Sequence, residues 1–486
     1  MPDEVLNIVW LKRDIRTNDH AALQAAEQSG NPYLIIFLFE PSMITYPDTS
    51  ERHLQFQYRC LQDFNHRMKL YNQKVHVFHA EAAQVFEYLL HQYKVAQVFS
   101  YEEHGHQLSW DRDRQVRDSL SKANVKWTEF KKNGVIRGSK NRIGWDKQWY
   151  VTMNEPQIQN EYAVAAEIEV DHPFQLQEDL REILAQYPEE FQPAGETFAW
   201  KYLRSFTEGR GANYHRFISK PELSRTSCSR LSPYLAWGNL SIKQAVQFIK
   251  HHPTYPDNKR AYQGLLTRLK WHCHFIQKFE VECDYETRCI NRGYELLEHD
   301  DNTQFVAAWQ EGKTGFPLVD ACMRCVRKTG WINFRMRAMV VSLLCHHLDQ
   351  DWRRGVYHLA KMFLDYEPGI HYPQFQMQAG TTGVNTIRMY NPVKQATDHD
   401  SEGNFIRKWV PELSKLPTEF VHEPWRMTGI EQELHDFRLG EDYPLPIIDL
   451  VESGRAARAK IWGHRKNDKV KEERIRILAT HTRNKN

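Results

Sequence analysis

The chain has 486 residues, of which 41% are apolar and 26% are charged. This balance predicts a globular protein of several domains and excludes a disordered one. The longest apolar run, residues 33–39, is far shorter than the roughly 20 residues of a membrane span, so we expect no contact with a membrane. No secretory pattern opens the chain and the eight cysteines are irregularly spaced, which predicts a cytoplasmic protein.

The charge is balanced overall but not along the chain. Lys and Arg number 64 against 62 Asp and Glu. From Gly454 to Asn486 there are eleven Lys/Arg and three Asp/Glu, a local charge of +8 on a body of −6. Such a tail either contacts a polyanion or forms a solvated terminal helix.

Short β-rich apolar runs alternate with helix-like segments over the first 130 residues. This alternation predicts an α/β domain with a doubly wound parallel sheet. The first run is followed by Leu11-Lys-Arg-Asp-Ile-Arg16, so the glycine-rich dinucleotide motif is absent. The predicted strands are 6–10, 33–39, 74–78, 95–100 and 125–130, with helices at 52–70 and 81–92 between them.

The remainder of the chain changes character twice. Residues from about 150 to 195 are polar, acidic and interrupted by prolines, which indicates a connection between domains. Apolar residues then recur at helical spacing to the end. We predict an α/β domain over residues 1–135, a linker over 136–197 and a helical domain over 198–486. Its clearest helices are 261–279, 317–328, 334–349 and 356–364.

Three polar clusters carry candidate chemistry. Hydroxyls surround one arginine in the segment 226–235, which suits a phosphate or diphosphate, or else a capped helix start. Arg335 and Arg337 lie two apart at a helix start, so their side chains diverge toward different partners. Asp365 and Glu367 either form ion pairs or hold a ring system and a ribose.

Motifs along nearly the whole chain resemble the photolyase/cryptochrome flavoproteins. The opening Trp10-Leu-Lys-Arg-Asp-Ile-Arg16 is similar to the start of that family, as is Ser229-Arg-Leu-Ser-Pro-Tyr-Leu235. Their order and spacing agree with the family, which makes the series far more specific than any one motif. The other matching segments are 309–315, 319–321, 329–331, 351–353, 391–392, 402–407 and 409–413.

The resemblance implies a helical domain that holds FAD, and blue-light chemistry on UV-damaged DNA. In the family, excited reduced flavin passes an electron to a flipped lesion and receives it back, so no acid–base pair is needed for cyclobutane dimers. The residues that match the family's cofactor contacts are Tyr214, Cys228, Ser229, Arg230, Leu231, Ser232, Arg337, Asp365, Tyr366, Glu367 and His371.

The positions that correspond to the lesion site depart from the family pattern. Trp271 matches the tryptophan on which the lesion stacks, but Arg268 replaces a glutamate and His272 an arginine. The predicted DNA and lesion contacts are Arg268, Trp271, His272, Phe334 and Arg335. Trp271, His371 and Arg337 are the predicted catalytic residues.

The family's chain of three tryptophans, which reduces the flavin, is also incomplete. Trp352 keeps the middle position, whereas Phe375 stands next to the flavin and His299 near the surface. A phenyl ring is much harder to oxidise than an indole. We therefore predict slow or rerouted photoreduction, with electron transfer through Trp352.

Cysteine and histidine pairs do not predict a metal. Cys322 and Cys325 lie on a matched helix, where such spacing is more typical of a core than of an iron–sulfur cluster. His272 and His274, like His346 and His347, are more typical of a polar lining.

The sequence therefore predicts a photolyase that splits cyclobutane pyrimidine dimers. A (6-4) photolyase and a cryptochrome photoreceptor without repair activity are the alternatives. The predicted partner is UV-damaged DNA, duplex or single-stranded, and the protein is expected to be a monomer. A folate or deazaflavin antenna, and the presence of any antenna, are left open.

Overall fold

The computed structural model describes residues 5–166 and 168–481 and divides into two compact units. Unit 1 comprises residues 1–208, 230–284 and 364–370. Unit 2 comprises residues 209–229, 285–363 and 371–486. Each unit is thus assembled from segments that are far apart in the sequence.

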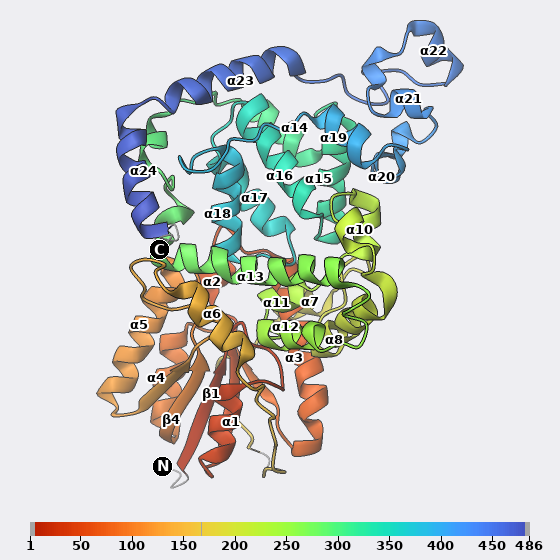
Figure 1. Ribbon diagram of the computed structural model, residues 1–486. Helices are drawn as coiled ribbons and strands as arrows, with labels where there is room; N and C mark the ends of the chain where they lie inside the picture. The colour runs from red at the N-terminus through yellow and green to blue at the C-terminus, as the bar shows by residue number, and fades with distance from the viewer. Residues whose placement is uncertain (1–4, 167, 482–486) are drawn as a thin grey trace. The chain divides into compact units, whose positions relative to one another are not determined.

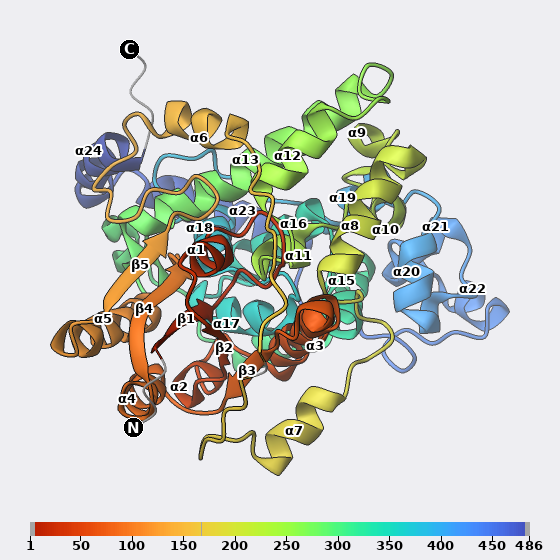
Figure 2. The ribbon, with the colours of Figure 1, turned by 90° about the horizontal axis from the view of Figure 1, so that it is seen from below.

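The sheet of unit 1 has five parallel strands in the order β3-β2-β1-β4-β5 (Figures 1 and 2). The chain moves outward from β1 through β2 to β3 and then returns to the other side of β1. This reversal creates a topological switch point between β1 and β4. The strands are β1 (Val5–Leu11), β2 (Tyr33–Leu38), β3 (Val75–Phe78), β4 (Lys94–Tyr101) and β5 (Lys126–Phe130), which confirms the predicted fold class.

The central strands are apolar along nearly their whole length because both faces of the sheet are covered. On β1, Leu6, Ile8 and Trp10 join a buried cluster with side chains of α4 (Ala82–Gln92) and α5 (Gln107–Lys122). The intervening Val9 and Leu11 are equally buried on the other face. The remaining elements before the first break in unit 1 are α1 (Ala21–Gln28), α2 (Pro41–Ile44), α3 (Glu51–Met68), η1 (Lys69–Tyr71), α6 (Trp145–Asn154), α7 (Glu178–Ala185) and α8 (Glu196–Ser205).

The polar segment predicted as a connection is partly structured. It contains α6 and α7, and Ile168, Val170 and Phe174 pack against the buried cluster of the sheet. Its few apolar side chains are therefore used in the core. After the π-turn η2 (Phe206–Arg210), unit 1 resumes with α11 (Ser232–Ala236), α12 (Ile242–Lys250) and α13 (Lys259–Val281).

The regular secondary structure of unit 2 is helical in its described residues, apart from one isolated bridge between Leu439 and Tyr443 (Figure 1). The predicted helix 334–349 is α16 (Phe334–Ser342) followed by a π-turn, η5 (Leu343–His347). The other elements are α9 (Tyr214–Phe217), α10 (Pro221–Ser227), η3 (Cys283–Glu286), η4 (Arg292–Leu296), α14 (Thr303–Glu311), α15 (Pro317–Thr329), α17 (Arg353–Met362), α18 (Pro368–Ala379), α19 (Pro392–His399), α20 (Asn404–Trp409), η6 (Pro411–Leu413), α21 (Thr418–Val421), η7 (Pro424–Arg426), α22 (Gly429–Leu434), α23 (Leu450–His464) and α24 (Asp468–His481). Helix α18 begins in unit 1 and continues in unit 2, and η3 likewise crosses a unit boundary.

Candidate flavin and DNA site

The predicted phosphate-binding loop lies between α10 and α11. Arg230 has a left-handed backbone, φ +59°, and Leu231 a right-handed helical one. Successive left- and right-handed helical residues turn neighbouring N–H groups toward one side, which makes a concave anion site. Pro233 is the second residue of α11, as expected of a proline near a helix start.

Arg210 holds the carbonyl side of this loop within unit 2. Its guanidinium donates to the carbonyl oxygens of Thr226, Cys228 and Ser229. The buried Ser227 Oγ has no hydrogen-bond partner among the described residues. In unit 1, the Gln192 amide donates to the carbonyl of Arg230 at 2.6 Å. Protein donors thus bind the carbonyl oxygens of the loop. The partial negative charge of these oxygens is compensated, so the loop suits an anion.

Tyr214 begins α9 in unit 2, and its side chain is buried. Cys228, Ser229 and Leu231 are buried as well, whereas Ser232 is half-buried. The segment from Tyr214 to Ser229 contains the short helices α9 and α10, and the phosphate-binding loop follows the end of α10.

Arg337 and His371 lie in unit 2 near the same phenyl ring. The Arg337 guanidinium carbon is 3.9 Å from the ring centroid of Phe363, and its Nε donates to the carbonyl of Ile332. The ring of His371 is 6.3 Å from that of Phe363, and its Nε2 donates to the carbonyl of Val356 at 2.8 Å. That bond sets the tautomer of a neutral His371, leaving Nδ1 as its acceptor.

The segment that follows Phe363 is held in unit 1 by several separate contacts. Trp237 Nε1 donates to the carbonyl of Leu364, and Arg13 donates to the carbonyl of Tyr366. The hydroxyl of Tyr366 is hydrogen-bonded to Asp48. Asp365 lies half-buried between these anchors. The backbone of this carboxylate-bearing segment is therefore fixed independently of any cofactor.

Glu367 forms a buried ion pair with His272 of α13. Their Oε2 and Nε2 atoms are 2.8 Å apart, and the side chains are 4% and 10% exposed. Burial lowers the pKa of His272, but the Glu367 carboxylate outweighs burial and raises that pKa to about 10. Burial likewise raises the pKa of Glu367, and the imidazolium lowers it below its ordinary value. The pair is therefore fully charged at neutral pH.

Trp271 precedes this ion pair and points outward. Its side chain is 45% exposed, and the Arg268 guanidinium carbon lies 4.1 Å from its ring centroid. Lys270 is paired with Asp146 at 2.7 Å, so its charge is compensated within unit 1. An exposed indole with an arginine over it offers a stacking surface with a nearby cation.

Phe334 and Arg335 begin α16 in unit 2. Phe334 is 41% exposed, and Arg335 donates from Nε to the hydroxyl of Ser219. Arg335 and Arg337 thus have different partners, as their spacing predicts. Asn333 caps the helix by accepting from the N–H of Met336.

Trp352 is buried in unit 2 and donates from Nε1 to Cys289 Sγ at 3.4 Å. Phe375 is 5.7 Å from the ring of His371, measured between centroids. His299 is paired with Asp349 at 3.2 Å. Cys322 and Cys325 are fully buried on α15, and no group of metal-ligating side chains occurs among the described residues.

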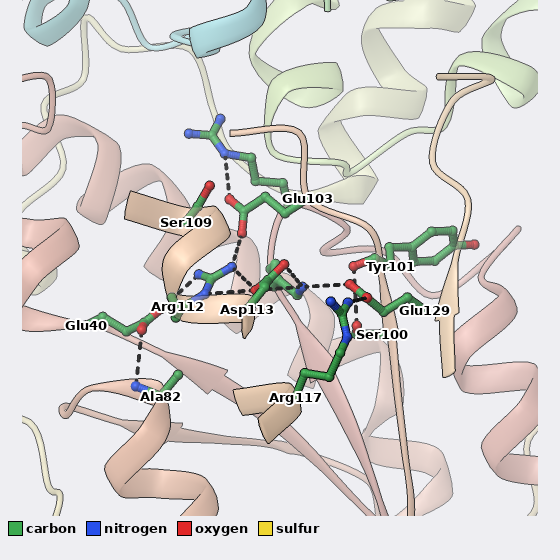
Figure 3. Close-up of polar contacts among 12 residues, drawn as sticks. Glu40, Ala82, Ser100, Tyr101, Glu103, Ser109, Arg112, Asp113, Arg117 and Glu129 are labelled. Carbon is green, nitrogen blue, oxygen red and sulfur yellow. Dashed lines mark hydrogen bonds and ion pairs between the residues drawn. The ribbon is translucent and has the colours of Figure 1, made fainter. Parts of the chain in front are cut away.

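A second polar site lies at the carboxyl ends of β1, β2 and β4 in unit 1 (Figure 3). A cavity of about 100 Å³ there is lined by Arg13, Glu40, Glu103 and Arg112, among others. Figure 3 shows the polar contacts of the last three. Open parallel sheets bind ligands at such switch points, so the position of this cavity suits an antenna chromophore.

The charges of this crevice are compensated by one another. Arg112 contacts Glu40 at 2.9 Å, Glu103 at 2.5 Å and Asp113 at 2.8 Å. Burial opposes the charge of Arg112, yet the three carboxylates raise its pKa well above the ordinary value. Burial alone raises the pKa of the Glu103 carboxyl. Its cationic neighbours lower that pKa by more, so it lies below its ordinary value.

Comparison with known proteins identifies the family. The family model described as the FAD binding domain of DNA photolyase matches residues 265–463, and the model described as DNA photolyase matches residues 7–140. The chain belongs to the photolyase/cryptochrome family. Its helical part is accordingly the family's FAD-binding domain, and FAD is its cofactor.

Individual members of the family are similar over different lengths. The deoxyribodipyrimidine photo-lyase of Alkalihalophilus pseudofirmus is 28% identical over 466 residues, covering 91% of this chain and 95% of that protein. Cryptochrome DASH of Synechocystis is 33% identical over 235 residues, 47% of each chain. The crystal structure of a Synechocystis cryptochrome covers 95% of this chain and 100% of its own, with a TM-score of 0.85 at 22% identity.

The residues of the loop fit the diphosphate of FAD. In unit 2, Arg210 binds carbonyl oxygens of the loop and the Ser227 hydroxyl has no hydrogen-bond partner among the described residues. In unit 1, the left-handed Arg230 turns neighbouring N–H groups to one side. Each of these features suits an anion. Arg210 did not emerge from the sequence, whereas Ser227 lies within the hydroxyl-rich segment 226–235. A turn with Gly209 at φ +143° brings Arg210 to carbonyls 16 to 19 residues later, which no local pattern indicates.

No helix among the described residues has the length and apolar content to cross a bilayer.

Proposed function

We propose that the protein repairs cyclobutane pyrimidine dimers in DNA, driven by blue light. The observation that carries this proposal is the exposed Trp271 on α13, with Arg268 over its ring and the His272–Glu367 pair directly behind it. Relatives named deoxyribodipyrimidine photo-lyase that match over nearly their whole length support it.

Each group of residues has a distinct role in this proposal. The indole of Trp271 stacks on the extruded lesion, and Arg268 binds an adjacent phosphate. The loop of Ser229 to Ser232 and Tyr214 bind the cofactor's diphosphate, and Arg337 and Asp365 flank its ring system. Reduced FAD, when bound, supplies the electron that splits the dimer after absorbing light.

The His272–Glu367 pair positions Trp271 within this scheme. Because the imidazolium forms an ion pair with a buried carboxylate, it fixes the turn of α13 on which Trp271 lies. His371 presents Nδ1 as an acceptor while Nε2 is held by Val356, which orients its ring rigidly. Tyr366, Cys228 and Leu231 contribute to the cofactor site through their backbone. Phe334 and Arg335 contact DNA beside the lesion.

Repair is tested with purified protein containing reduced flavin and oligonucleotides that carry one defined lesion. The expected result is loss of cyclobutane dimers in light and not in darkness, in single or double strands. Trp271→Ala is expected to reduce repair, while Leu434→Ala, which truncates an exposed apolar side chain of α22 outside the proposed DNA surfaces, retains it. If wild type leaves the dimer intact in light, the proposal is wrong.

A (6-4) photolyase is the second candidate, because two histidines lie at predicted site positions. That chemistry needs a histidine that moves a proton. His272 is held charged by Glu367, and His371 is hydrogen-bonded to a carbonyl. The same assay with a (6-4) photoproduct distinguishes the two candidates. Failure with both lesions in the presence of reduced flavin indicates the photoreceptor function of a cryptochrome.

We also propose that Trp352 is the electron donor that re-reduces the flavin, with Phe375 as a barrier in its path. The barrier follows from the much higher oxidation potential of a phenyl ring. Transient absorption on oxidised protein is expected to show slow photoreduction in wild type and faster photoreduction in Phe375→Trp. If Trp352→Phe leaves the rate unchanged, another residue is the donor.

The proposed domains are the α/β domain over residues 1–135, the connection over 136–197 and the FAD domain over 198–486. Limited proteolysis followed by mass spectrometry tests these boundaries, and cleavage is expected first within 136–197.

A further inference from the structure

Helix α23 presents one face to the interior of unit 2 and one face outward. The inner face is Gly454, Ala457 and Ile461, which are buried. Asp449 caps the start of the helix by accepting from the N–H groups of Val451 and Glu452. The helix is therefore held in a defined rotation.

Polar contacts fix the same rotation. Lys460 binds Asp349 at 2.6 Å, and Nε2 of His464 is hydrogen-bonded to the carbonyl of Gly293 at 2.9 Å. Both groups lie on the inner side of the helix with Ile461. The outward face consequently has a fixed composition.

This outward surface, here the Trp462 face, consists of Arg455, Arg458, Trp462, Arg465 and Lys466. The residues recur at intervals of three and four, so they form a continuous stripe across adjacent turns. The indole of Trp462 is 48% exposed, and the guanidinium carbon of Arg465 lies 5.1 Å from its ring centroid.

The cations of the Trp462 face lack internal counterions. Within the described chain, none of the four has a carboxylate at ion-pair distance, and residues 453–467 contain no Asp or Glu. Some other exposed arginines of unit 2 are paired. Arg426 pairs with Glu423 at 3.1 Å, and Arg438 with Glu441 at 3.4 Å. On the Trp462 face, by contrast, four cations without such a carboxylate partner among the described residues lie on adjacent turns around one exposed indole.

An exposed indole among uncompensated cations matches the chemistry of single-stranded nucleic acids. Such strands bind through phosphate–cation contacts and through bases that stack on aromatic rings. A membrane fits less well, because interfacial helices bury a broad apolar face and this one offers only Val451 and Trp462, separated by the arginines. We propose that the Trp462 face binds a single strand of DNA, with one base stacked on Trp462 and phosphates on its arginines.

This surface is separate from the DNA contacts predicted on α16. Phe334 is the first residue of α16, and His347 is the last residue of the η5 turn that continues it. Fourteen residues of helix span about 20 Å. Helix α23 packs at the far end, since a side chain at Gly454 would lie 3.3 Å from His347. The Trp462 face therefore binds a strand at a distance from Phe334. It binds damaged and undamaged DNA equally.

The proposal rests on the proposed function only for its choice of DNA as the polymer. The test measures the affinity of the FAD-loaded full chain for fluorescent single-stranded oligonucleotides, with and without one cyclobutane dimer, over a range of salt. Trp462→Ala is expected to weaken both affinities by roughly 5- to 150-fold. Arg455→Gln with Arg458→Gln is expected to reduce the salt slope by about 1.4, for two lost phosphate contacts on a single strand.

The matched control is Arg426→Gln with Arg438→Gln, which removes the same charge from exposed arginines that have carboxylate partners. It is expected to bind as wild type does. Circular dichroism and flavin absorbance check the fold of every variant. If the α23 variants and the control bind DNA equally, the proposal is overturned. If they bind DNA equally but differ in sedimentation with anionic lipid vesicles, the face is a membrane contact instead.

The failure of the proposed function has a different signature. Loss of preference for the dimer in wild type would contradict lesion recognition by Trp271 while leaving the effect of Trp462→Ala measurable. Conversely, an unaltered affinity in Trp462→Ala beside a normal preference for the dimer would overturn the Trp462 face alone.

Discussion

The crevice at the strand ends of unit 1 and the Trp462 face of unit 2 are both rich in arginine, but they satisfy their charges differently. Arg112 is bound by three carboxylates within its own unit. Arg455 and Arg458 are exposed on α23, and neither has a carboxylate at ion-pair distance among the described residues, although Glu452 lies one turn before Arg455. Buried charge without a partner is very costly, whereas exposed charge is stabilised by water and available to another molecule. Charge satisfied internally therefore serves stability, and charge left unsatisfied at the surface serves binding.

The largest effect is expected when the buried network loses its central cation. Arg112→Met leaves Glu40, Glu103 and Asp113 without it and is expected to lower the free energy of unfolding by about 3–5 kcal/mol. Denaturant unfolding measures this change. The control is Arg117→Met, which removes a 53% exposed partner of Glu129 and is expected to cost at most about 1 kcal/mol. If both variants lost the same free energy of unfolding, the buried network would be no more important for stability than an exposed ion pair.

The His272–Glu367 pair is expected to give a somewhat smaller effect that depends on pH. The pKa of His272 rises from 6.5 in the unfolded chain to about 10 in the folded protein. Its stabilisation is thus complete below pH 6.5 and is lost as the pH rises toward 10. His272→Gln is expected to cost about 3 kcal/mol at neutral pH, with a difference from wild type that shrinks toward pH 10.

Unfolding measured at a series of pH values tests this prediction. His272→Arg is the control, because an arginine stays charged throughout the range and should abolish the pH dependence above 6.5. A constant difference between wild type and His272→Gln from neutral pH to pH 10 would show that His272 is not charged in the folded protein.

An exposed side chain should affect binding more than folding. Trp271→Ala is expected to reduce the preference for dimer-containing over intact DNA by roughly 1–3 kcal/mol. Its unfolding free energy should stay within about 0.5 kcal/mol of wild type. Competition binding with the two oligonucleotides measures the preference. A variant that keeps the preference but loses stability would reverse the roles assigned to Trp271.

The smallest effect on folding is expected at the Trp462 face. Arg455→Gln with Arg458→Gln should change the unfolding free energy by no more than about 0.5 kcal/mol, because neither arginine has a carboxylate partner among residues 5–166 and 168–481. Thermal unfolding at low and high salt measures the change. A loss near that of Arg112→Met would mean that these arginines stabilise unit 2 rather than bind a partner.

The elements that the sequence predicts best are those whose signal is local. All five strands of the sheet appear within one residue or two of their predicted ends, and the predicted helix 261–279 lies inside α13. Apolar runs and helical periodicity are properties of neighbouring residues, so they are visible before the chain folds. The helix start at Pro233 is predictable for the same reason.

The predicted helix 334–349 shows where a local signal fails. Apolar residues continue through this segment, yet the hydrogen bonding changes to a π-turn at Leu343–His347. Helical periodicity does not distinguish an α-turn from a single wider one. The connection before residue 195 shows the opposite failure, because its few apolar residues are used in the core although its composition is polar.

Family resemblance and residue types selected the candidate site, including Trp271, Glu367 and the loop at Ser229, but not its pairings. Tertiary structure alone decides that Glu367 meets His272, which is 95 residues earlier, and that Arg210 binds the loop at Cys228. It also decides that Arg112 has three carboxylate partners, whereas Arg455 has none among the described residues. Sequence by itself determines periodicity and therefore secondary structure. The partner of a charged side chain depends on which distant segments pack together, and only the folded chain contains that information.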